Sequence, residues 1–265
     1  MFHACTPDTE KCGLTGGGTT VLAVVCPDAV NHVKNDLLVF ARVKDGKYIP
    51  VDDYDDAGKK TGDRGCILRA VKTFYTWDGP ETVKVKIDSA VISRYNGSNV
   101  TAGRFGSRYL LEKTTLASNT ELSSEELFEG ISSKSGDSTF FRIARIPALD
   151  SLRDRFHRVG FQPVRFPGTN EILCIANAKD SAVAVSNLYF LTVSGRSVSI
   201  KDIIPGEFPV KGKWGWGYKF LDYRDADSDG IPELFLLFNG SDSTAVDVFR
   251  KSGNKFQKIF GHRLY

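Results

Sequence analysis

The chain has 265 residues, of which 41% are hydrophobic and 25% charged, and its formal net charge is +3. This length is enough for one large domain or two small ones, and this composition is ordinary for a globular protein with a buried core. The small net charge and the lack of a Lys/Arg block argue against nucleic-acid binding. No run of about 18 apolar residues is present, so no membrane span is predicted.

The N-terminal region predicts an extension, residues 1–18, before a β domain over 19–265. No basic and apolar leader follows Met1, so the start fits either a cytosolic chain or a mature secreted chain behind an initiator Met. Cysteines gather in the first quarter without CxxC spacing, at Cys5, Cys12, Cys26 and Cys66, and Cys174 stands alone. This cluster favours two disulfides over a zinc site, with the pairing open, and predicts a secreted, periplasmic or cell-surface protein.

A run of aspartates follows in "VDDYDDAGKKTGDRG", at Asp52, Asp53, Asp55 and Asp56. These residues offer oxygens for a cation, with Gly58 behind them. An exposed loop at the end of a hairpin is the interpretation that charge runs favour.

Four segments predict the same β-hairpin: a strand, a tight glycine turn and a second strand. They are residues 38–51, 90–103, 188–200 and 246–259, with turn glycines Gly46, Gly97, Gly195 and Gly253. The gap between Gly97 and Gly195 is about twice as wide as the other two, and "STFFRIARIPAL" (138–149) predicts a degenerate strand unit within it.

A second pattern precedes three of these hairpins: a strand, a glycine turn, and a further strand that starts at Glu81, Glu171 or Glu233. Four strands in roughly 50 to 60 residues are typical of a β-propeller blade, which buries both faces of its sheet only between neighbouring blades. The sequence therefore predicts an all-β, propeller-like fold of about five four-stranded units. A β-sandwich or two small β domains are the alternatives.

Helical periodicity is rare. The segment "LDSLRDRFHRVG" predicts one short helix near 150–159, capped by Asp150 and ended by Gly160, with an apolar face made of Leu152, Phe156 and Val159. A shorter helix is predicted at "SSEELFEG", where Ser123 and Glu126 have capping-box spacing.

His157 lies in the longer predicted helix among Arg153, Arg155 and Arg158. We interpret this group as a solvated basic face that suits an acidic partner.

The segment "KWGWGYKF" places Trp214, Trp216, Tyr218 and Phe220 at alternate positions, so on a strand their side chains share one face. A buried row fills the space between sheets, and Gly215 and Gly217 then allow a close approach. An exposed row stacks on sugar rings or a partner protein. We favour burial, with Trp214 the most exposed, and take Trp214, Trp216 and Tyr218 as candidate partner-binding residues.

The segment "DADSDGIPELFLLF" (225–238) places Asp225, Asp227 and Asp229 at alternate positions just before a strand. Carboxylates this close repel one another unless a cation lies among them. Calcium takes six to eight oxygen ligands and accepts crowded carboxylates. The sequence therefore predicts a Ca²⁺ site, and Gly230 permits the sharp turn that gathers the oxygens.

The same loop offers the carbonyl of Ile231 and the carboxylate of Glu233 as further ligands. An EF-hand would need a glutamate where Leu236 stands and a helix after it, whereas strand residues follow. The pattern is therefore a nine-residue loop between two strands.

This pattern, D-x-D-x-D-G-x-x-E-L followed by a strand, resembles the calcium loops of FG-GAP/VCBS-type repeats, as in integrin-like β-propellers. The resemblance covers residues 225–238, and the other units keep the glycine, glutamate and strand without the aspartates. It implies a calcium ion at the end of a blade and a binding role, with ligands from Asp225, Asp227, Asp229, Glu233 and the Ile231 carbonyl. The alternative is a solvated acidic turn whose Asp side chains cap backbone amides.

Signatures of catalysis are scarce, because the four histidines are scattered and neither HExxH nor GxSxG occurs. The sequence therefore predicts an extracytoplasmic, calcium-stabilised binding module for a protein or carbohydrate partner. A polysaccharide-acting hydrolase or lyase, a structural spacer domain and a protein inhibitor are the alternatives.

Overall fold

The computed structural model describes residues 12, 14, 18–27, 35–53, 62–78, 81–95, 98–105, 114–122, 129–209, 217–240 and 243–265. These residues form two compact units. Unit 1 takes its residues from 1–123, 224–233 and 260–265, and unit 2 takes them from 124–223 and 234–259.

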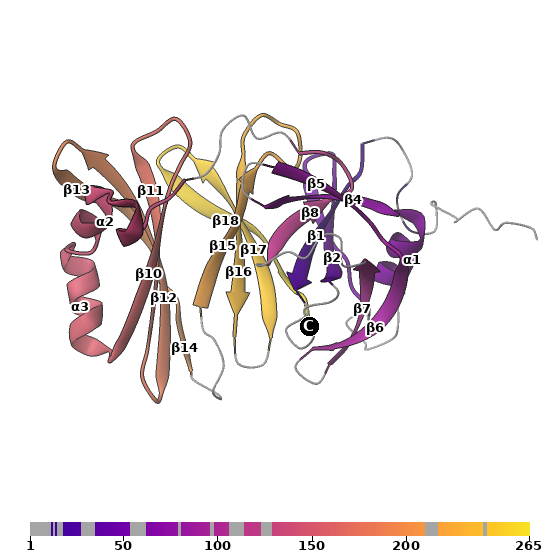
Figure 1. The fold of residues 1–265 in the computed structure, drawn as a ribbon, viewed down its shortest axis with the longest axis horizontal. Helices are drawn as coiled ribbons and strands as arrows, with labels where there is room; N and C mark the ends of the chain where they lie inside the picture. Colours follow the sequence, from indigo (N-terminus) through magenta and orange to yellow (C-terminus); the bar gives the residue numbers. More distant parts are fainter. Residues whose placement is uncertain are drawn as a thin grey trace, which may run out of the picture. The chain divides into compact units, whose positions relative to one another are not determined.

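Unit 1 is built on an eight-stranded sheet with the strand order β5-β4-β8-β1-β2-β7-β6, and β3 pairs with β2 (Figure 1). Its strand pairs are antiparallel. The strands are β1 (Thr20–Pro27), β2 (Asn35–Lys44), β3 (Lys47–Pro50), β4 (Thr73–Asp78), β5 (Glu81–Lys86), β6 (Ser89–Tyr95), β7 (Ser98–Phe105) and β8 (Thr115–Ser118).

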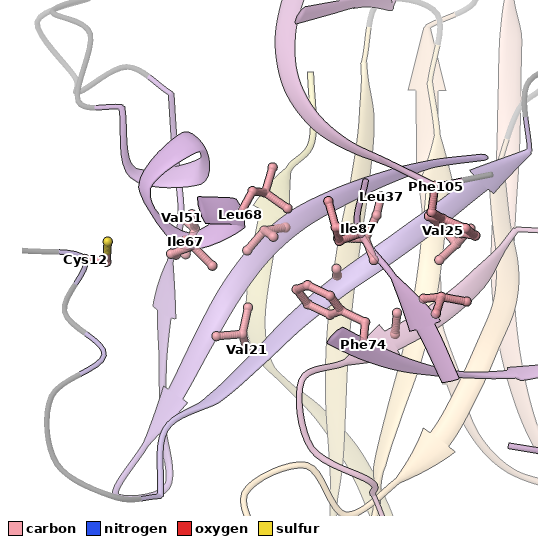
Figure 2. Close-up of a cluster of buried hydrophobic side chains, with 14 residues drawn as sticks. Cys12, Val21, Val25, Leu37, Val51, Ile67, Leu68, Phe74, Ile87 and Phe105 are labelled. Carbon is pink, nitrogen blue, oxygen red and sulfur yellow. The ribbon is translucent and has the colours of Figure 1, made fainter. Parts of the chain in front are cut away.

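The core of unit 1 lies between this sheet and the helix α1 (Asp63–Ala70) (Figure 2). The helix contributes Ile67 and Leu68, which are fully buried beside Phe74 of β4. At Gly103 of β7 the sheet leaves no room for a side chain, since an added Cβ would lie 2.8 Å from Cδ2 of Leu68. A larger residue at this position would push the helix side chains away from the sheet.

Unit 2 contains a six-stranded sheet with the order β13-β12-β11-β10-β9, in which β14 also pairs with β12. These strands are β9 (Glu129–Gly130), β10 (Arg158–Arg165), β11 (Glu171–Lys179), β12 (Val183–Ser194), β13 (Ser197–Ile204) and β14 (Glu207–Pro209). A four-stranded sheet follows in chain order, with β15 (Gly217–Arg224), β16 (Glu233–Asn239), β17 (Thr244–Ser252) and β18 (Lys255–Arg263).

The six-stranded sheet is covered on both faces. The 3₁₀ helix η2 (Ser133–Ser135) precedes α2 (Ser138–Ile143) and α3 (Pro147–Arg155), and these two α-helices lie on one face (Figure 1). Cys174 and Ala176 of β11 pack on the helix side, and Leu173 and Ile175 pack against the four-stranded sheet. Two-sided burial explains why β11 has a nearly continuous apolar sequence.

The predicted all-β class is confirmed, and the four predicted hairpins form as β2–β3, β6–β7, β12–β13 and β17–β18. The three glutamates begin β5, β11 and β16 as expected. Two of the predicted four-stranded units are present, because β10–β13 and β15–β18 each lie side by side in chain order.

The first half of the chain pairs differently from the prediction. The hairpins β4–β5 and β6–β7 lie at opposite ends of one sheet, with β8, β1 and β2 between them. The described strands thus form sheets of eight, six and four strands, and not about five equal units. The segment 138–149, predicted as a degenerate strand unit, is helical in α2 and the start of α3.

The predicted helix near 150–159 exists as α3 but starts and ends earlier. Pro147 occupies its first turn, where a missing N–H costs nothing, so Asp150 lies inside the helix and is not its cap. Phe156 follows the helix end, and Val159 and Gly160 belong to β10. Of the segment "SSEELFEG", Glu129–Gly130 forms β9, and the predicted cap residues Ser123 and Glu126 lie outside the described residues.

One disulfide joins Cys12 to Cys66 of α1, with their Cα atoms 5.5 Å apart. Cys26 and Cys174 are free thiols, so the prediction of two disulfides is wrong for Cys26, and Cys5 is not among the described residues. Burial, reinforced by the negative charge of Asp36, raises the pKa of Cys26 to about 12, and burial alone does the same for Cys174. Both thiols are therefore protonated and unreactive near neutral pH.

Within the described part of the chain, no helix has the length and apolar character that crossing a bilayer requires.

Candidate metal site in the β15–β16 loop

The acidic loop connects β15 to β16 and brings the three predicted aspartates together. One carboxylate oxygen each of Asp225, Asp227 and Asp229 lies within 4.8 Å of the other two. Asp225 and Asp227 are half-buried and Asp229 is exposed. We call these three carboxylate oxygens the acidic cup.

The backbone of the loop wraps around Asp225. Its Oδ2 accepts a hydrogen bond from the N–H of Gly230 at 2.9 Å, and its Oδ1 accepts one from Asp229 at 3.2 Å. Gly230 has a φ of 85°, so the turn predicted at this glycine is confirmed, and Ser228 also has a positive φ, at 62°. A residue with a Cβ is strained at such angles, which makes glycine the fitting choice at position 230.

Glu233 has a different place from the three aspartates. It is fully buried, and its Oε2 accepts a 2.9 Å hydrogen bond from the N–H of Ala226, which is also fully buried. This bond joins the two ends of the loop. The oxygens that gather within 4.8 Å come from the three aspartates, and the bond to Ala226 shows that Glu233 helps to close the loop.

Ile231 takes part in the loop through its backbone. Its N–H donates to Oδ1 of Asp229 at 2.8 Å, and its side chain is 45% exposed. Ile231 follows Asp229 and Gly230 in the chain, so its carbonyl has the position that the sequence pattern assigns to a backbone ligand.

The start of the loop is held by Arg224, whose importance was not apparent from the sequence. Its guanidinium lies 4.2 Å from the centroid of the Trp77 ring on β4, and its Nη1 donates to the carbonyl of Leu122 at 3.4 Å. On the other side, a Cβ added to Gly46 in the β2–β3 turn would lie 3.8 Å from Oδ2 of Asp227. The loop belongs to unit 1, and these contacts hold it within that unit.

The donor set fits calcium better than a softer metal. Hard divalent cations prefer carboxylate and carbonyl oxygens, and the described cluster contains no His or Cys. Three like charges within 4.8 Å repel one another, and a divalent ion offsets that repulsion. Asp225, Asp227 and Asp229 would hold such an ion, and Glu233 would keep the loop closed.

The second acidic run does not form a comparable cup. Asp53 is buried, forms an ion pair with Arg64 at 3.4 Å, and accepts from the N–H of Thr101 at 2.8 Å. It is thus neither exposed, as expected for this run, nor available to a cation. Asp52 lies 3.2 Å from Nε2 of His262, and Asp55, Asp56 and Gly58 fall outside the residues that the structure describes.

The pKa values of the groups around Asp53 follow from burial. Burial lowers the pKa of Arg64, although the neighbouring Asp53 and Asp52 oppose that shift. Burial also lowers the pKa of His262. Both residues belong to unit 1.

Of the aromatic row, only its last part is described. Trp214 and Trp216 lie outside the described residues. Tyr218 is half-buried against the core of unit 2, and its hydroxyl donates to Oδ2 of Asp247 at 2.6 Å. Gly217 permits the expected close approach, because an added Cβ would lie only 2.0 Å from Oδ1 of Asn177. Tyr218 is thus engaged inside its unit.

Comparison of the chain with models of known protein families, with curated proteins and with solved structures finds no match.

Proposed function

We propose that the protein is a calcium-stabilised binding module that works outside the cytoplasm on a protein or carbohydrate partner. The observation that carries the proposal is the convergence of Asp225, Asp227 and Asp229 within 4.8 Å in a loop whose ends are tied together by Glu233. The resemblance of this loop to FG-GAP/VCBS-type calcium loops points in the same direction.

The role of calcium in this proposal is structural. The loop joins two strands of one sheet, and its entrance is held by Arg224 on Trp77. An ion among the three carboxylates would fix the loop in one conformation. The disulfide between Cys12 and Cys66 supports a location in an oxidising compartment.

We also propose a propeller-like arrangement for this part of the chain, and the two meanders β10–β13 and β15–β18 support it. Each has the four strands in chain order that a propeller blade has, and in each the second strand starts at a glutamate. We propose that residues 158–204 and 217–263 are two copies of one repeat.

A binding role is favoured over polysaccharide hydrolysis by the character of the open cleft in unit 2. That cleft is lined by His157, Arg158 and Lys179, and none of its described lining residues is Asp or Glu. Hydrolysis of a glycosidic bond ordinarily needs a pair of carboxyl groups facing the sugar.

The calcium proposal is tested by thermal unfolding with excess Ca²⁺ and with EDTA. A ligand at about 100 times its Kd stabilises the folded state by about 2.7 kcal/mol, which corresponds to a Tm increase of about 5 to 10 °C for a chain of this size. Titration calorimetry is expected to give one bound ion. Mg²⁺ is expected to raise Tm less, because it retains its waters and requires regular octahedral geometry.

The matched variants are Asp227→Asn in the cup and Asp154→Asn on the exposed face of α3. Each removes one negative charge. Asp227→Asn is expected to remove the calcium-dependent part of Tm, whereas Asp154→Asn keeps it. Equal Tm values of the wild-type protein in Ca²⁺ and EDTA would rule the calcium site out.

A further inference from the structure

The cleft in unit 2 lies at the open end of the β10–β11 pair, just after α3, and has a volume of about 520 Å³. Sites for small molecules usually enclose about 300 to 1,000 Å³. The cleft is therefore much larger than a single inorganic anion and suits a ligand of roughly disaccharide size.

Two cations face each other across the strands at this cleft. Arg158 of β10 is directly opposite Lys179 of β11, and Gly160 is opposite Asn177 on the same face of the sheet. Like charges at directly opposed positions destabilise a strand pair. Among the described residues, the side chain of neither Arg158 nor Lys179 makes a hydrogen bond or an ion pair.

The face that carries these cations changes character along β11. Leu173 and Ile175 pack in the core between the two sheets, and Asn177 then donates to the carbonyl of Tyr218 at 3.0 Å and accepts from Oγ of Ser186 at 2.6 Å. Lys179 comes next on the same face and is half-exposed. The apolar core thus ends in a polar rim, and the two cations stand at that rim.

The space in front of the cations is open at Gly160. A Cβ added there would have no heavy atom within 4 Å, and the backbone does not have a positive φ. The missing side chain therefore contributes to the hollow, and a larger residue would enter the cleft without backbone strain.

The nearest acid in the sequence, Asp180, is occupied by the turn that follows β11. Its Oδ1 accepts hydrogen bonds from the N–H groups of Ala182 at 2.7 Å and Val183 at 2.8 Å. These bonds lower the pKa of Asp180, and Arg155 and His157 contribute to the same shift. Asp180 stabilises the turn and leaves the charges of Arg158 and Lys179 available.

We infer that this cleft binds a small acidic saccharide, with its carboxylate or sulfate group between Arg158 and Lys179 and its sugar body over Gly160. Arginine and lysine donate charge-assisted hydrogen bonds to such oxyanions. The inference rests on the proposed binding role, and it names the ligand class. It does not depend on calcium, because none of the residues of the acidic loop lines the cleft.

The test is titration calorimetry of the full chain with four probes: a disaccharide that contains a uronic acid, a sulfated disaccharide, the neutral disaccharide maltose, and inorganic sulfate. At least one acidic disaccharide is expected to bind with a Kd of about 1 mM or tighter, and maltose and inorganic sulfate at least about tenfold more weakly. The two acidic probes distinguish carboxylate from sulfate recognition. Each titration is run in Ca²⁺ and in EDTA, with the same binding expected in both.

Three variants separate charge from shape. Arg158→Gln and Lys179→Gln are each expected to weaken binding about tenfold, because each loses a charge-assisted hydrogen bond. Gly160→Leu keeps both charges and is expected to abolish binding by filling the cleft. The control is Arg196→Gln, which removes an exposed arginine in the β12–β13 turn and is expected to leave binding unchanged.

Several results would overturn the inference: no binding of either acidic disaccharide at about 10 mM, binding of inorganic sulfate as tight as that of the disaccharides, or unchanged binding by Gly160→Leu. The Tm of every variant is measured without ligand. If a glutamine variant unfolds, Arg158→Lys and Lys179→Arg replace it and are expected to retain binding. If the acidic disaccharide binds but calcium does not change the Tm, the cleft is supported and only the calcium proposal is rejected.

Discussion

The guanidinium of Arg224 lies 4.2 Å from the centroid of the Trp77 ring, and both side chains are 6% exposed. Arg224 directly precedes Asp225, and its Nη1 also reaches the carbonyl of Leu122. This contact holds the first residue of the acidic loop against β4, so the position of the three carboxylates depends on a residue that carries no ligand atom.

A double-mutant cycle measures this contact. Arg224→Leu and Trp77→Leu are expected to be coupled by about 1 to 2 kcal/mol in the free energy of unfolding, because the cation–π contact is largely desolvated. Urea unfolding of the wild type, both single variants and the double variant in EDTA gives the coupling. Additive effects of the two substitutions would show that the ring and the guanidinium contribute independently.

The bond between Glu233 and Ala226 predicts that Glu233 stabilises the loop even without metal. Glu233→Leu leaves the buried N–H of Ala226 without its acceptor, which is expected to cost about 1 to 3 kcal/mol in EDTA. Glu233→Gln keeps an acceptor oxygen and is expected to cost less.

The measurement for Glu233 is again chemical denaturation, now with and without Ca²⁺. A ligand role predicts that Glu233→Gln is harmless in EDTA and harmful only in calcium. The closing role predicts a loss for Glu233→Leu in both conditions, and an unchanged stability of this variant in EDTA would contradict it.

The disulfide between Cys12 and Cys66 spans 54 residues of sequence. Closing a loop of that length is expected to stabilise the protein by about 4 kcal/mol through the entropy of the unfolded chain. The double variant Cys12→Ser/Cys66→Ser should lose about this amount in thermal or urea unfolding. Cys26→Ala, which removes a free thiol, is the control and should lose much less, and an equal loss would show that the disulfide adds nothing.

Cys174 predicts a specific alkaline loss of stability. Burial raises the pKa of its thiol from 9.0 to about 12, so the folded state favours the protonated form. Its contribution is fully present below pH 9 and is lost as the pH rises towards 12. Relative to Cys174→Ala, the wild type should therefore lose up to about 1.4 kcal/mol per pH unit above pH 9.

The measurement for Cys174 is the difference in unfolding free energy between wild type and Cys174→Ala from pH 7 to pH 11. A constant offset comes from the missing sulfur and carries no information on titration. A difference that does not change above pH 9 would contradict the raised pKa.

The hairpins at Gly46, Gly195 and Gly253 and the tight acidic loop at Gly230 could be predicted from the sequence, because each depends on residues a few positions apart. Turn geometry and strand alternation are local properties of the chain, and local patterns preserve them. The sequence by itself therefore determined the all-β class and the meeting of the three aspartates.

Only the tertiary structure decided which strands share a sheet and what surrounds the loop. The backbone hydrogen bonds that pair β1 with β8 do not depend on side-chain identity, so a sequence pattern does not specify them. The repeat pattern therefore predicted strand neighbours that the first half of the chain does not have, since β5 and β6 lie at opposite ends of their sheet. In the same way Arg224 meets Trp77 and Cys12 meets Cys66 through contacts between distant segments. Such contacts depend on the packing of the whole unit, because the native contacts stabilise one another only when the complete arrangement has formed.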